Sequence, residues 1–579
     1  MITYRVDVAD PQAHHFHVTL TLSAPAAEQL LSLPVWIPGS YMVREFGRHL
    51  SGLQARQGQR EVALEQLDKT RWRARCSGRA ALTLSYRVYA FDTSVRTAFL
   101  DARRGFFNGT SLFLRAEGRE AEAQRVQIGS LPEGWQIATG MRATAARQFE
   151  AADYDELVDH PFELGRFWRG SFQACGVAHE FVVAGAWPGF DGQRLLKDTQ
   201  RICEQQIRFW HGDNKGNVGA APFDRYVFLL NAVDEGYGGL EHRASTALIS
   251  TRRDLPRERM EGLSDGYATL LGLISHEYFH TWNVKRLKPA DFARYDYMQE
   301  NYTRLLWFFE GFTSYYDDLM LLRAGLIDAG RYLKLLGKAI NAVAATPGRQ
   351  VQSVADSSFD AWVKYYRADE NTPNATVSYY LKGSLVALAL DLRLREQGGS
   401  LDAVMRRLWK TSGGGPISED DIAAAMQVVG GRSFAPELQA WVHGTEDLPL
   451  ATLLDEVGVL LRCERAGFAA GLGLRLSEGP VTGVQVKAVL AGSAAARAGL
   501  SAGDELLAVD GWRLRRFDDA LNWTERGQPF DLLLVRDQRL QTVRVLPQAD
   551  SALAQTSVLQ LVDKPVRAVM SRRRAWLDG

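Results

Sequence analysis

Two histidines one helical turn apart, with a glutamate beside the first, have the spacing in this sequence that best fits a chemical site. His276, Glu277 and His280 occur in LISHEYFHTWN, an H-E-x-x-H pattern. Side chains at positions i and i+4 lie on one face of a helix, so both imidazoles can bind one metal ion while the glutamate reaches a water on it. This is the chemistry of zinc hydrolases. The alternative is a structural helix whose histidines pack against neighbouring aromatic residues.

A catalytic zinc site needs a third protein ligand as well as an open position. Glu300 lies among polar residues, whereas Glu310 is embedded in LLWFFEGFTSYYDD, where burial of an unpaired carboxylate would be unfavourable. Metal coordination would remove that cost, so we favour Glu310. Asp317, two helical turns later on the same face, could accept a hydrogen bond from the non-ligating nitrogen of a ligand histidine. Otherwise it is a solvated surface aspartate.

Helices must position these side chains. Apolar residues at helical spacing predict a helix from Asp265 to about Val284, beginning at a Ser-Asp cap, and a second one from about Tyr302 to Leu322. The stretch SYYLKGSLVALALDLRLREQGG predicts a third helix that ends at two glycines. Ahead of them, RYVFLLNA predicts one buried strand, followed by the glycine-rich stretch NAVDEGYGGLEHRAST. The histidines and Glu310 should therefore lie on neighbouring helices beside a small sheet.

The period of the apolar residues changes twice along the chain and predicts a multidomain α+β protein. We expect a β-sandwich over residues 1–181, a mainly helical domain over 182–448, a small β domain over 449–550 and a tail over 551–579. The basic run Arg572 to Arg574 in that tail is interpreted as solvated. WIPGSYMVREF in the first domain is a well-ordered loop that either serves a site or covers a core.

Composition excludes several classes of partner. The 579 residues carry 68 Lys and Arg against 68 Asp and Glu, which argues against a binder of nucleic acid or anionic membranes. The start lacks a secretory signal, and we see no window apolar enough for a membrane helix. The four cysteines, Cys76, Cys175, Cys203 and Cys463, are scattered and form no CxxC pair, which suggests a reducing cytoplasm. A metal site would therefore use His and carboxylate ligands.

Two segments resemble known families. H-E-x-x-H followed by W-F-F-E-G-F-T-S-Y resembles the gluzincin metallopeptidases, whose third zinc ligand is a Glu in this context. The segment Gly483 to Gly511, GVQVKAVLAGSAAARAGLSAGDELLAVDG, is similar to a PDZ domain. A β-sandwich, a thermolysin-like domain and a C-terminal PDZ domain together resemble the glycyl aminopeptidase family over essentially the whole chain. The resemblance implies one zinc ion and peptide substrates.

The spacing of the ligands distinguishes this family from a sister family. The shorter spacing of aminopeptidase N-like enzymes would place the third ligand at Gln299, a residue that does not normally bind zinc, whereas Glu310 fits the glycyl aminopeptidase pattern. Tyr380 in Y-L-K-G resembles the tyrosine that donates a hydrogen bond to the developing oxyanion in gluzincin aminopeptidases. Tyr379 is its rival, and both could instead be aromatic residues of helix packing.

A second element of the family is the strand that binds the substrate. GGLEH, with Gly238, Gly239 and Glu241, resembles the G-A-M-E-N strand of aminopeptidases, where the Glu captures the free amine and the strand pairs with the peptide backbone. His242 replaces the usual Asn, so the amine site could be altered. The alternative is that Glu241 is an ordinary strand carboxylate.

These expectations combine into a zinc aminopeptidase with Glu277 as general base, and the resemblance implies a preference for small N-terminal residues such as Gly or Ala. Two alternatives stay open. One is a zinc endopeptidase to which the PDZ-like domain delivers protein substrates, and the other is a non-catalytic peptide-binding scaffold. The PDZ-like domain could bind a peptide C-terminus through backbone N–H groups near Gly471 to Leu474, or it could be a packed scaffold.

Overall fold

The computed structural model describes residues 2–213, 215–548 and 552–579. Contacts divide the chain into two compact units. One contains Met1–Tyr302 with Trp409–Pro416, and the other contains Thr303–Leu408 with Ile417–Gly579.

The N-terminal part of the first unit consists of three sheets around one hydrophobic core. Alternating sequences produce this arrangement, because successive side chains of a strand point to opposite faces. In β2, HFHVTLTL, every second residue is buried. The large sheet contains, in chain order, β1 (Ile2–Asp10), β2 (His15–Leu22), β4 (Leu50–Gln57), β5 (Arg60–Val62), β8 (Leu82–Tyr89), β12 (Gln124–Ile128), β14 (Arg142–Ala145) and β15 (Gln148–Ala151). The predicted β-rich N-terminal domain is confirmed.

Two four-stranded sheets complete this domain. One contains β3 (Glu28–Ser32), β6 (Leu64–Gln66), β7 (Arg71–Arg75) and β11 (Arg115–Ala116), and the other contains β9 (Ala98–Leu100), β10 (Arg104–Phe107), β13 (Gln136–Thr139) and β16 (Phe162–Gly165). Two short helices, α1 (Gly109–Leu112) and α2 (Tyr154–Val158), lie between strands in the sequence.

A five-stranded sheet follows in the same unit, in the order β17 (Trp168–Ala174), β18 (Val177–Ala184), β19 (Arg225–Val233), β21 (Ser245–Thr251) and β20 (Tyr237–Glu241). The predicted strand RYVFLLNA is β19, whose residues are almost all buried. β20, which carries GGLE, is an edge strand of this sheet. The predicted boundary at residue 181 falls inside β18, which pairs in parallel with β19.

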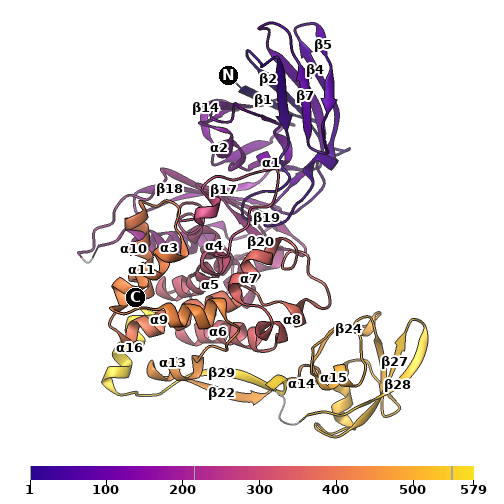
Figure 1. Cartoon of the computed structure of the whole chain (residues 1–579), viewed down its shortest axis with the longest axis vertical. Helices are drawn as coiled ribbons and strands as arrows, with labels where there is room; N and C mark the ends of the chain where they lie inside the picture. The colour runs from indigo at the N-terminus through magenta and orange to yellow at the C-terminus, as the bar shows by residue number, and fades with distance from the viewer. Residues whose placement is uncertain (1, 214, 549–551) are drawn as a thin grey trace. The chain divides into compact units, whose positions relative to one another are not determined.

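Two helices cover this sheet in Figure 1: α3 (Gly192–His211) packs against β17, and α4 (Asp265–Phe279) packs against β20 and β21. The predicted cap of α4 is present, because the side chain of Ser264 accepts the Tyr267 N–H. The helix ends earlier than predicted, at Phe279, and the chain continues in tight turns through Val284.

Helices dominate residues 303–456. They are α5 (Leu306–Arg323), α6 (Ala329–Ala344), α7 (Val354–Phe359), α8 (Thr372–Ala375), α9 (Leu381–Glu396), α10 (Leu401–Ser412), α11 (Glu419–Gly430), α12 (Ala435–Leu438) and α13 (Leu450–Glu456). α5 and α9 cross closely at two glycines. A Cβ atom on Gly311 would lie 2.6 Å from the backbone of Gly383, so neither position has room for a side chain.

The PDZ-like module interrupts a two-stranded ribbon. Strand β22 (Val459–Arg465) pairs antiparallel with β29 (Gln555–Leu561) along its whole length, so the chain enters and leaves the module side by side (Figure 1). The module contains α14 (Phe468–Gly471), β23 (Leu474–Gly479), β24 (Gly483–Val489), α15 (Ala494–Arg497), β25 (Glu505–Val509), β26 (Trp512–Arg513), β27 (Phe530–Arg536) and β28 (Arg539–Val545) around its own core.

The last residues form helix α16 (Arg567–Leu577), which packs against α5 and α9. Trp576 is fully buried and donates its indole N–H to the hydroxyl of Tyr315 at 3.0 Å. The guanidinium of Arg573 donates to the carbonyls of Val457 and Gly458. The interpretation of the basic run as solvated is therefore wrong for Arg573, which anchors the helix.

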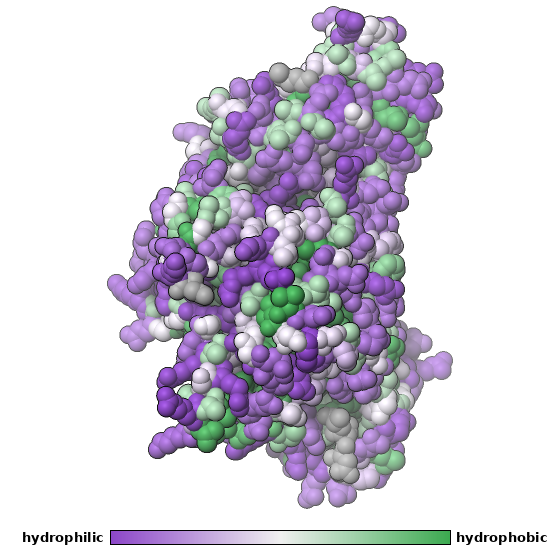
Figure 2. Space-filling model, turned by 60° about the vertical axis from the view of Figure 1, so that its left-hand side comes forward, coloured by the Kyte–Doolittle hydropathy of each residue, from purple (hydrophilic) through white to green (hydrophobic). Residues whose placement is uncertain are grey.

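No helix among the described residues combines the length and apolar character needed to cross a bilayer. On the face drawn in Figure 2, hydrophobic residues form small separate groups among hydrophilic ones.

Candidate active site

Aromatic residues on one side of α4 fix the helix against the sheet. Tyr278 is fully buried, packs against Tyr226 and Phe228 of β19, and places its hydroxyl 2.8 Å from Nε2 of His179 on β18. Burial lowers the pKa of His179 to about 4, with a smaller opposing effect from its hydrogen bond to a backbone carbonyl, so this histidine is neutral at pH 7. The aromatic residues of H-E-Y-F-H-x-W therefore orient the helix.

His276 and His280 converge on one point. Their Nε2 atoms are 3.0 Å apart and their ring centroids 4.6 Å apart. Two nitrogen ligands of a tetrahedral zinc, each about 2.0–2.1 Å from the metal, are separated by roughly 3.3 Å, so the pair fits zinc. Nδ1 of His280 lies 2.8 Å from the carbonyl oxygen of Asn283. A proton on Nδ1 donates to that carbonyl and leaves the Nε2 lone pair available to a metal.

Glu277 points to the edge strand. Its side chain is 5% exposed, and a Cβ atom on Gly239 would lie 2.0 Å from its Oε1 atom. The absence of a side chain at Gly239 is therefore what lets the carboxylate approach β20. A group bound along this strand would lie next to Glu277, the candidate general base.

Glu241, at the end of β20, is 4% exposed and faces a loop of the N-terminal domain. A Cβ atom on Gly39 would lie 2.6 Å from both carboxylate oxygens, and Gly39 has φ +93°, which disfavours other residues. The loop WIPGSY, undecided from the sequence, thus forms one wall around Glu241. In the sequence, only the combination of Pro, Gly and aromatic residues indicated that this loop could belong to a site.

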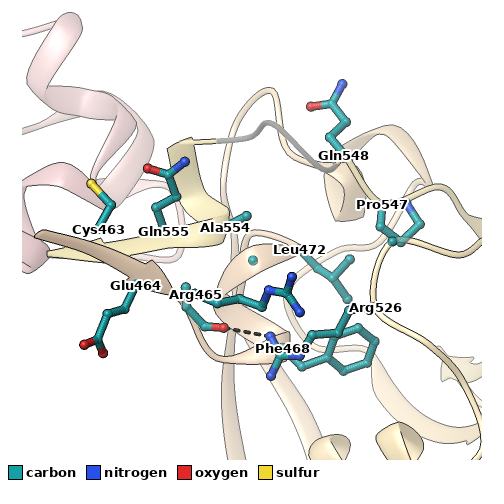
Figure 3. A pocket seen from close by; sticks show the side chains of 13 residues that line it. Cys463, Glu464, Arg465, Phe468, Leu472, Arg526, Pro547, Gln548, Ala554 and Gln555 are labelled. Carbon is teal, nitrogen blue, oxygen red and sulfur yellow. Dashed lines mark hydrogen bonds between the residues drawn. The ribbon is translucent and has the colours of Figure 1, made fainter.

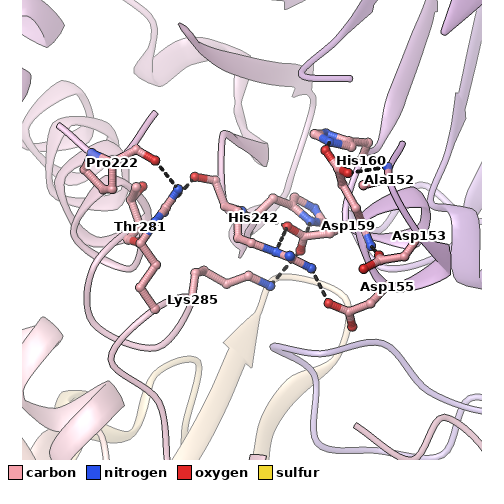
Figure 4. Close-up of polar contacts among 12 residues, drawn as sticks. Ala152, Asp153, Asp155, Asp159, His160, Pro222, His242, Thr281 and Lys285 are labelled. Carbon is pink, nitrogen blue, oxygen red and sulfur yellow. Dashed lines mark hydrogen bonds and ion pairs between the residues drawn. The ribbon is translucent and has the colours of Figure 1, made fainter. Parts of the chain in front are cut away.

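The residues that follow Glu241 in the sequence belong to a buried ionic network that the sequence did not predict (Figure 4). Asp159 is 2.8 Å from Nζ of Lys285, and it accepts hydrogen bonds from the backbone and side chain of Arg243. Burial alone would raise the pKa of Asp159, but Lys285, Arg243 and His242 together hold it well below its usual value. The network fixes the turn that follows β20, and its members come from distant segments without a shared motif.

His242, which replaces the family asparagine, belongs to this network. It is 1% exposed, and its Nδ1 lies 3.3 Å from Asp159. Burial lowers its pKa, while Asp159 opposes that change. Its Nε2 has no hydrogen-bond partner within residues 2–213, 215–548 and 552–579. His242 is therefore a neutral side chain that supports the strand end.

In the second unit, Glu310 lies on α5 and is 2% exposed. The close crossing of α5 and α9 brings it near the tyrosines at the start of α9. Burial raises the pKa of Tyr380 well above its usual value, and the nearby Glu310 raises it further. The hydroxyl of Tyr380 lies 3.3 Å from that of Tyr366. Tyr380 therefore stays protonated and can donate a hydrogen bond at neutral pH.

The rival tyrosine is less accessible. Tyr379 is fully buried and stacks on Tyr380 with ring centroids 4.8 Å apart, whereas Tyr380 is partly exposed. Asp317 accepts the backbone N–H of Asp318 at 2.6 Å. Its contact with a ligand histidine stays a prediction.

Comparison with known proteins places the chain in a family. Three family models match: the Peptidase M61 N-terminal domain at residues 3–166, the M61 glycyl aminopeptidase at 269–386 and a PDZ domain at 463–524. No curated protein matches the chain. Among solved structures, an aminopeptidase N family protein from Idiomarina loihiensis is 37% identical with a TM-score of 0.93, and the alignment covers 100% of both chains.

A more distant match is an M1 zinc metallopeptidase from Deinococcus radiodurans, with 17% identity and a TM-score of 0.47 over 78% of this chain and 94% of that chain. The Glu mutant of that enzyme bound to a Tyr-Ser-Ala substrate has a TM-score of 0.46 at 17% identity, with the same coverage of both chains. The predicted fold class and PDZ domain are confirmed by the family models. The chain therefore belongs to the M61 glycyl aminopeptidase family, and it is a zinc metallopeptidase of the aminopeptidase type.

Proposed function

We propose that this protein removes single N-terminal residues from peptides, with one zinc ion held by His276, His280 and Glu310. The observation that carries the proposal is a convergence of ligand atoms: one atom from each of these side chains lies within 4.8 Å of the other two. A four-coordinate ion can bind such a set and keep one position for water or substrate. The bond that fixes the proton on His280 supports the same assignment.

Each remaining side chain has a task in hydrolysis. When bound, zinc polarises a carbonyl and lowers the pKa of a water molecule to about 7. Glu277 accepts a proton from the water and returns it to the leaving nitrogen, which is general acid–base catalysis. Tyr380 donates its hydroxyl hydrogen to the carbonyl oxygen as negative charge develops there. Glu241 accepts hydrogen bonds from the substrate ammonium and so limits cleavage to the first peptide bond.

We propose that the enzyme prefers substrates whose N-terminal residue is small, Gly or Ala. The family description is glycyl aminopeptidase. The main chain at Gly39 also occupies one side of Glu241, which restricts the space beside the amine. A bulky first side chain would meet this wall.

Most of the predicted carboxylate cradle of the PDZ-like module, Gly471 to Leu474, is engaged internally. The N–H groups of Gly471, Leu472 and Gly473 donate to carbonyls of residues 467–470 within their own turn. We therefore propose that a peptide C-terminus binds to other donors in the module.

A neighbouring cavity offers such donors. It has a volume of about 350 Å³ and is lined by Arg465 and Arg526 among other residues. Figure 3 shows the guanidinium groups of both arginines, and it shows Glu464 pointing away from them. Arg526 also stacks over Phe468 and donates to the carbonyl of Ala466. We propose that this cavity receives the carboxylate of a peptide C-terminus. Charge-assisted hydrogen bonds from arginine suit that group.

A cytoplasmic location is part of the proposal. All four cysteines are free thiols, as expected in a reducing compartment.

The test uses a panel of short peptides with Gly, Ala, Leu or Phe at the N-terminus, each with a free and an acetylated amine. We expect cleavage of free Gly and Ala peptides only, and its loss in Glu277→Gln. Cleavage of acetylated peptides would favour the endopeptidase alternative. Unchanged activity in Glu277→Gln would contradict the mechanism, and a protein without stoichiometric zinc would contradict the metal site.

A further inference from the structure

An arginine of the N-terminal domain reaches the substrate strand. Arg96 lies between β8 and β9, and its Nη2 donates to the carbonyl of Gly239 at 3.4 Å. A Cβ atom on Gly238 would lie 3.8 Å from Nη1 and 3.9 Å from Nη2 of the same guanidinium. The charged group therefore lies over the two glycines of the edge strand β20.

The hydrogen-bonding capacity of this guanidinium is largely unused. Within the described residues Arg96 forms no ion pair, its buried Nε has no hydrogen-bond partner, and the bond to Gly239 is long. Arginine carries five N–H donors and stays charged at any physiological pH. A guanidinium with this much unused capacity beside a binding strand is suited to an anionic group of a ligand.

The distance between Arg96 and Glu241 defines the length of a ligand that contacts both residues. Gly238 precedes Glu241 by three residues, and a strand rises about 3.3 Å per residue, so the two positions are roughly 10 Å apart. An extended tripeptide spans about the same length. If its amine pairs with Glu241 and its backbone lies antiparallel along β20, its C-terminal carboxylate reaches Arg96.

The geometry points to Arg96 as the residue that binds the C-terminal carboxylate of short peptide substrates, so that the enzyme prefers tripeptides. This inference rests on the proposed aminopeptidase function. A longer or amidated peptide places a neutral group beside Arg96 and loses the charge-assisted hydrogen bonds. The substrate class is therefore the short products of other peptidases.

The experiment compares kcat/KM for Ala-Ala-Ala and for the same peptide with a C-terminal amide. We expect the wild type to prefer the free acid by about tenfold, since hydrogen bonds to charged groups are stronger than neutral ones. Arg96→Gln should remove this preference by raising KM for the acid while leaving the amide unchanged. Arg87→Gln, on the exposed face of β8, is the matched control and should behave as the wild type.

Two results would overturn the inference. In one, Arg96→Gln lowers the rates for acid and amide equally, which means that Arg96 only holds β20 in place. In the other, the wild type does not distinguish acid from amide. Failure of the wild type to cleave either peptide would instead overturn the aminopeptidase function itself, and the inference with it.

Discussion

At the residue scale, the carboxylates of this site depend on glycines for their positions. Glu277 lies against Gly239, and Glu241 lies against Gly39. The sequence predicted both glutamates because their motifs are local, and it predicted Gly239 as part of the strand. Gly39 is more than two hundred residues away from Glu241 in the sequence, so only the fold reveals the contact. Asn283 was missed because its backbone carbonyl, which any residue has, contacts His280.

Gly39→Ala tests the contact with Glu241. The added Cβ must displace the carboxylate, and we expect KM for free-amine peptides to rise by up to about 100-fold, because a misplacement of about 1 Å can cost that much. Gly118→Ala is the control, because Gly118 has φ +80° but no atom within 4 Å of its Cβ position. The double variant Gly39→Ala with Glu241→Asp should recover activity, since the shorter acid makes room. Equal effects of the two glycine substitutions would contradict a specific contact.

Tyr380→Phe tests the hydrogen-bond donor. The loss of one oxyanion donor should lower kcat by about 10²–10³ with little change in KM. Tyr379→Phe, the matched control in the same stack, should lower kcat far less because that ring is buried. Steady-state kinetics on an alanine peptide measures both. A larger decrease of kcat in Tyr379→Phe than in Tyr380→Phe would show that Tyr379 is the hydrogen-bond donor.

At the element scale, periodicity predicted the helices because their apolar faces are continuous. The capping box Ser418–Asp421 and the cap Ser264 begin α11 and α4. The close crossing of α5 and α9 was not predictable, because a single glycine in each of two segments does not show that the two helices contact each other. The network around Asp159 was missed for a related reason: a buried ion pair is a property of the contact between elements and not of either sequence segment.

The contact between α4 and β18 predicts a pH dependence of stability. His179 is neutral in the folded protein down to about pH 4, because burial lowers its pKa from 6.5. Between these values only the unfolded chain takes up the proton, so stability is full above pH 6.5 and falls by up to about 3 kcal/mol as the pH decreases to 4. Denaturant unfolding of the wild type and His179→Gln should give a shallower pH slope for the variant. Parallel curves would contradict this assignment.

At the scale of the whole molecule, the second unit contains a module inserted into a ribbon. β22 and β29 pair up to Arg465 and Gln555, at the border of the PDZ-like module. The sequence predicted the module from its strands and turns. It did not predict that residues 555–577 return to α5 and α6, because β29 and α16 are short and lack a recognisable motif.

Replacement of residues 466–554 by an Asn-Gly turn should therefore close β22 and β29 into a hairpin. We expect a folded protein that cleaves tripeptides at nearly the wild-type rate, while deletion of residues 567–579 should prevent folding because Trp576 is fully buried. Thermal unfolding and peptide kinetics measure both variants. Loss of tripeptide cleavage in a folded hairpin variant would show that the module contributes to catalysis.

The proposed hydrolysis depends on one zinc ion bound by His276, His280 and Glu310. Anomalous diffraction from crystals of the full chain, recorded on both sides of the zinc absorption edge, shows whether this ion is present. We expect one zinc peak about 2.0–2.2 Å from Nε2 of both histidines and from a carboxylate oxygen of Glu310. Absence of a zinc peak at this position, or a peak bound by the histidines with Glu310 directed elsewhere, would contradict the proposal.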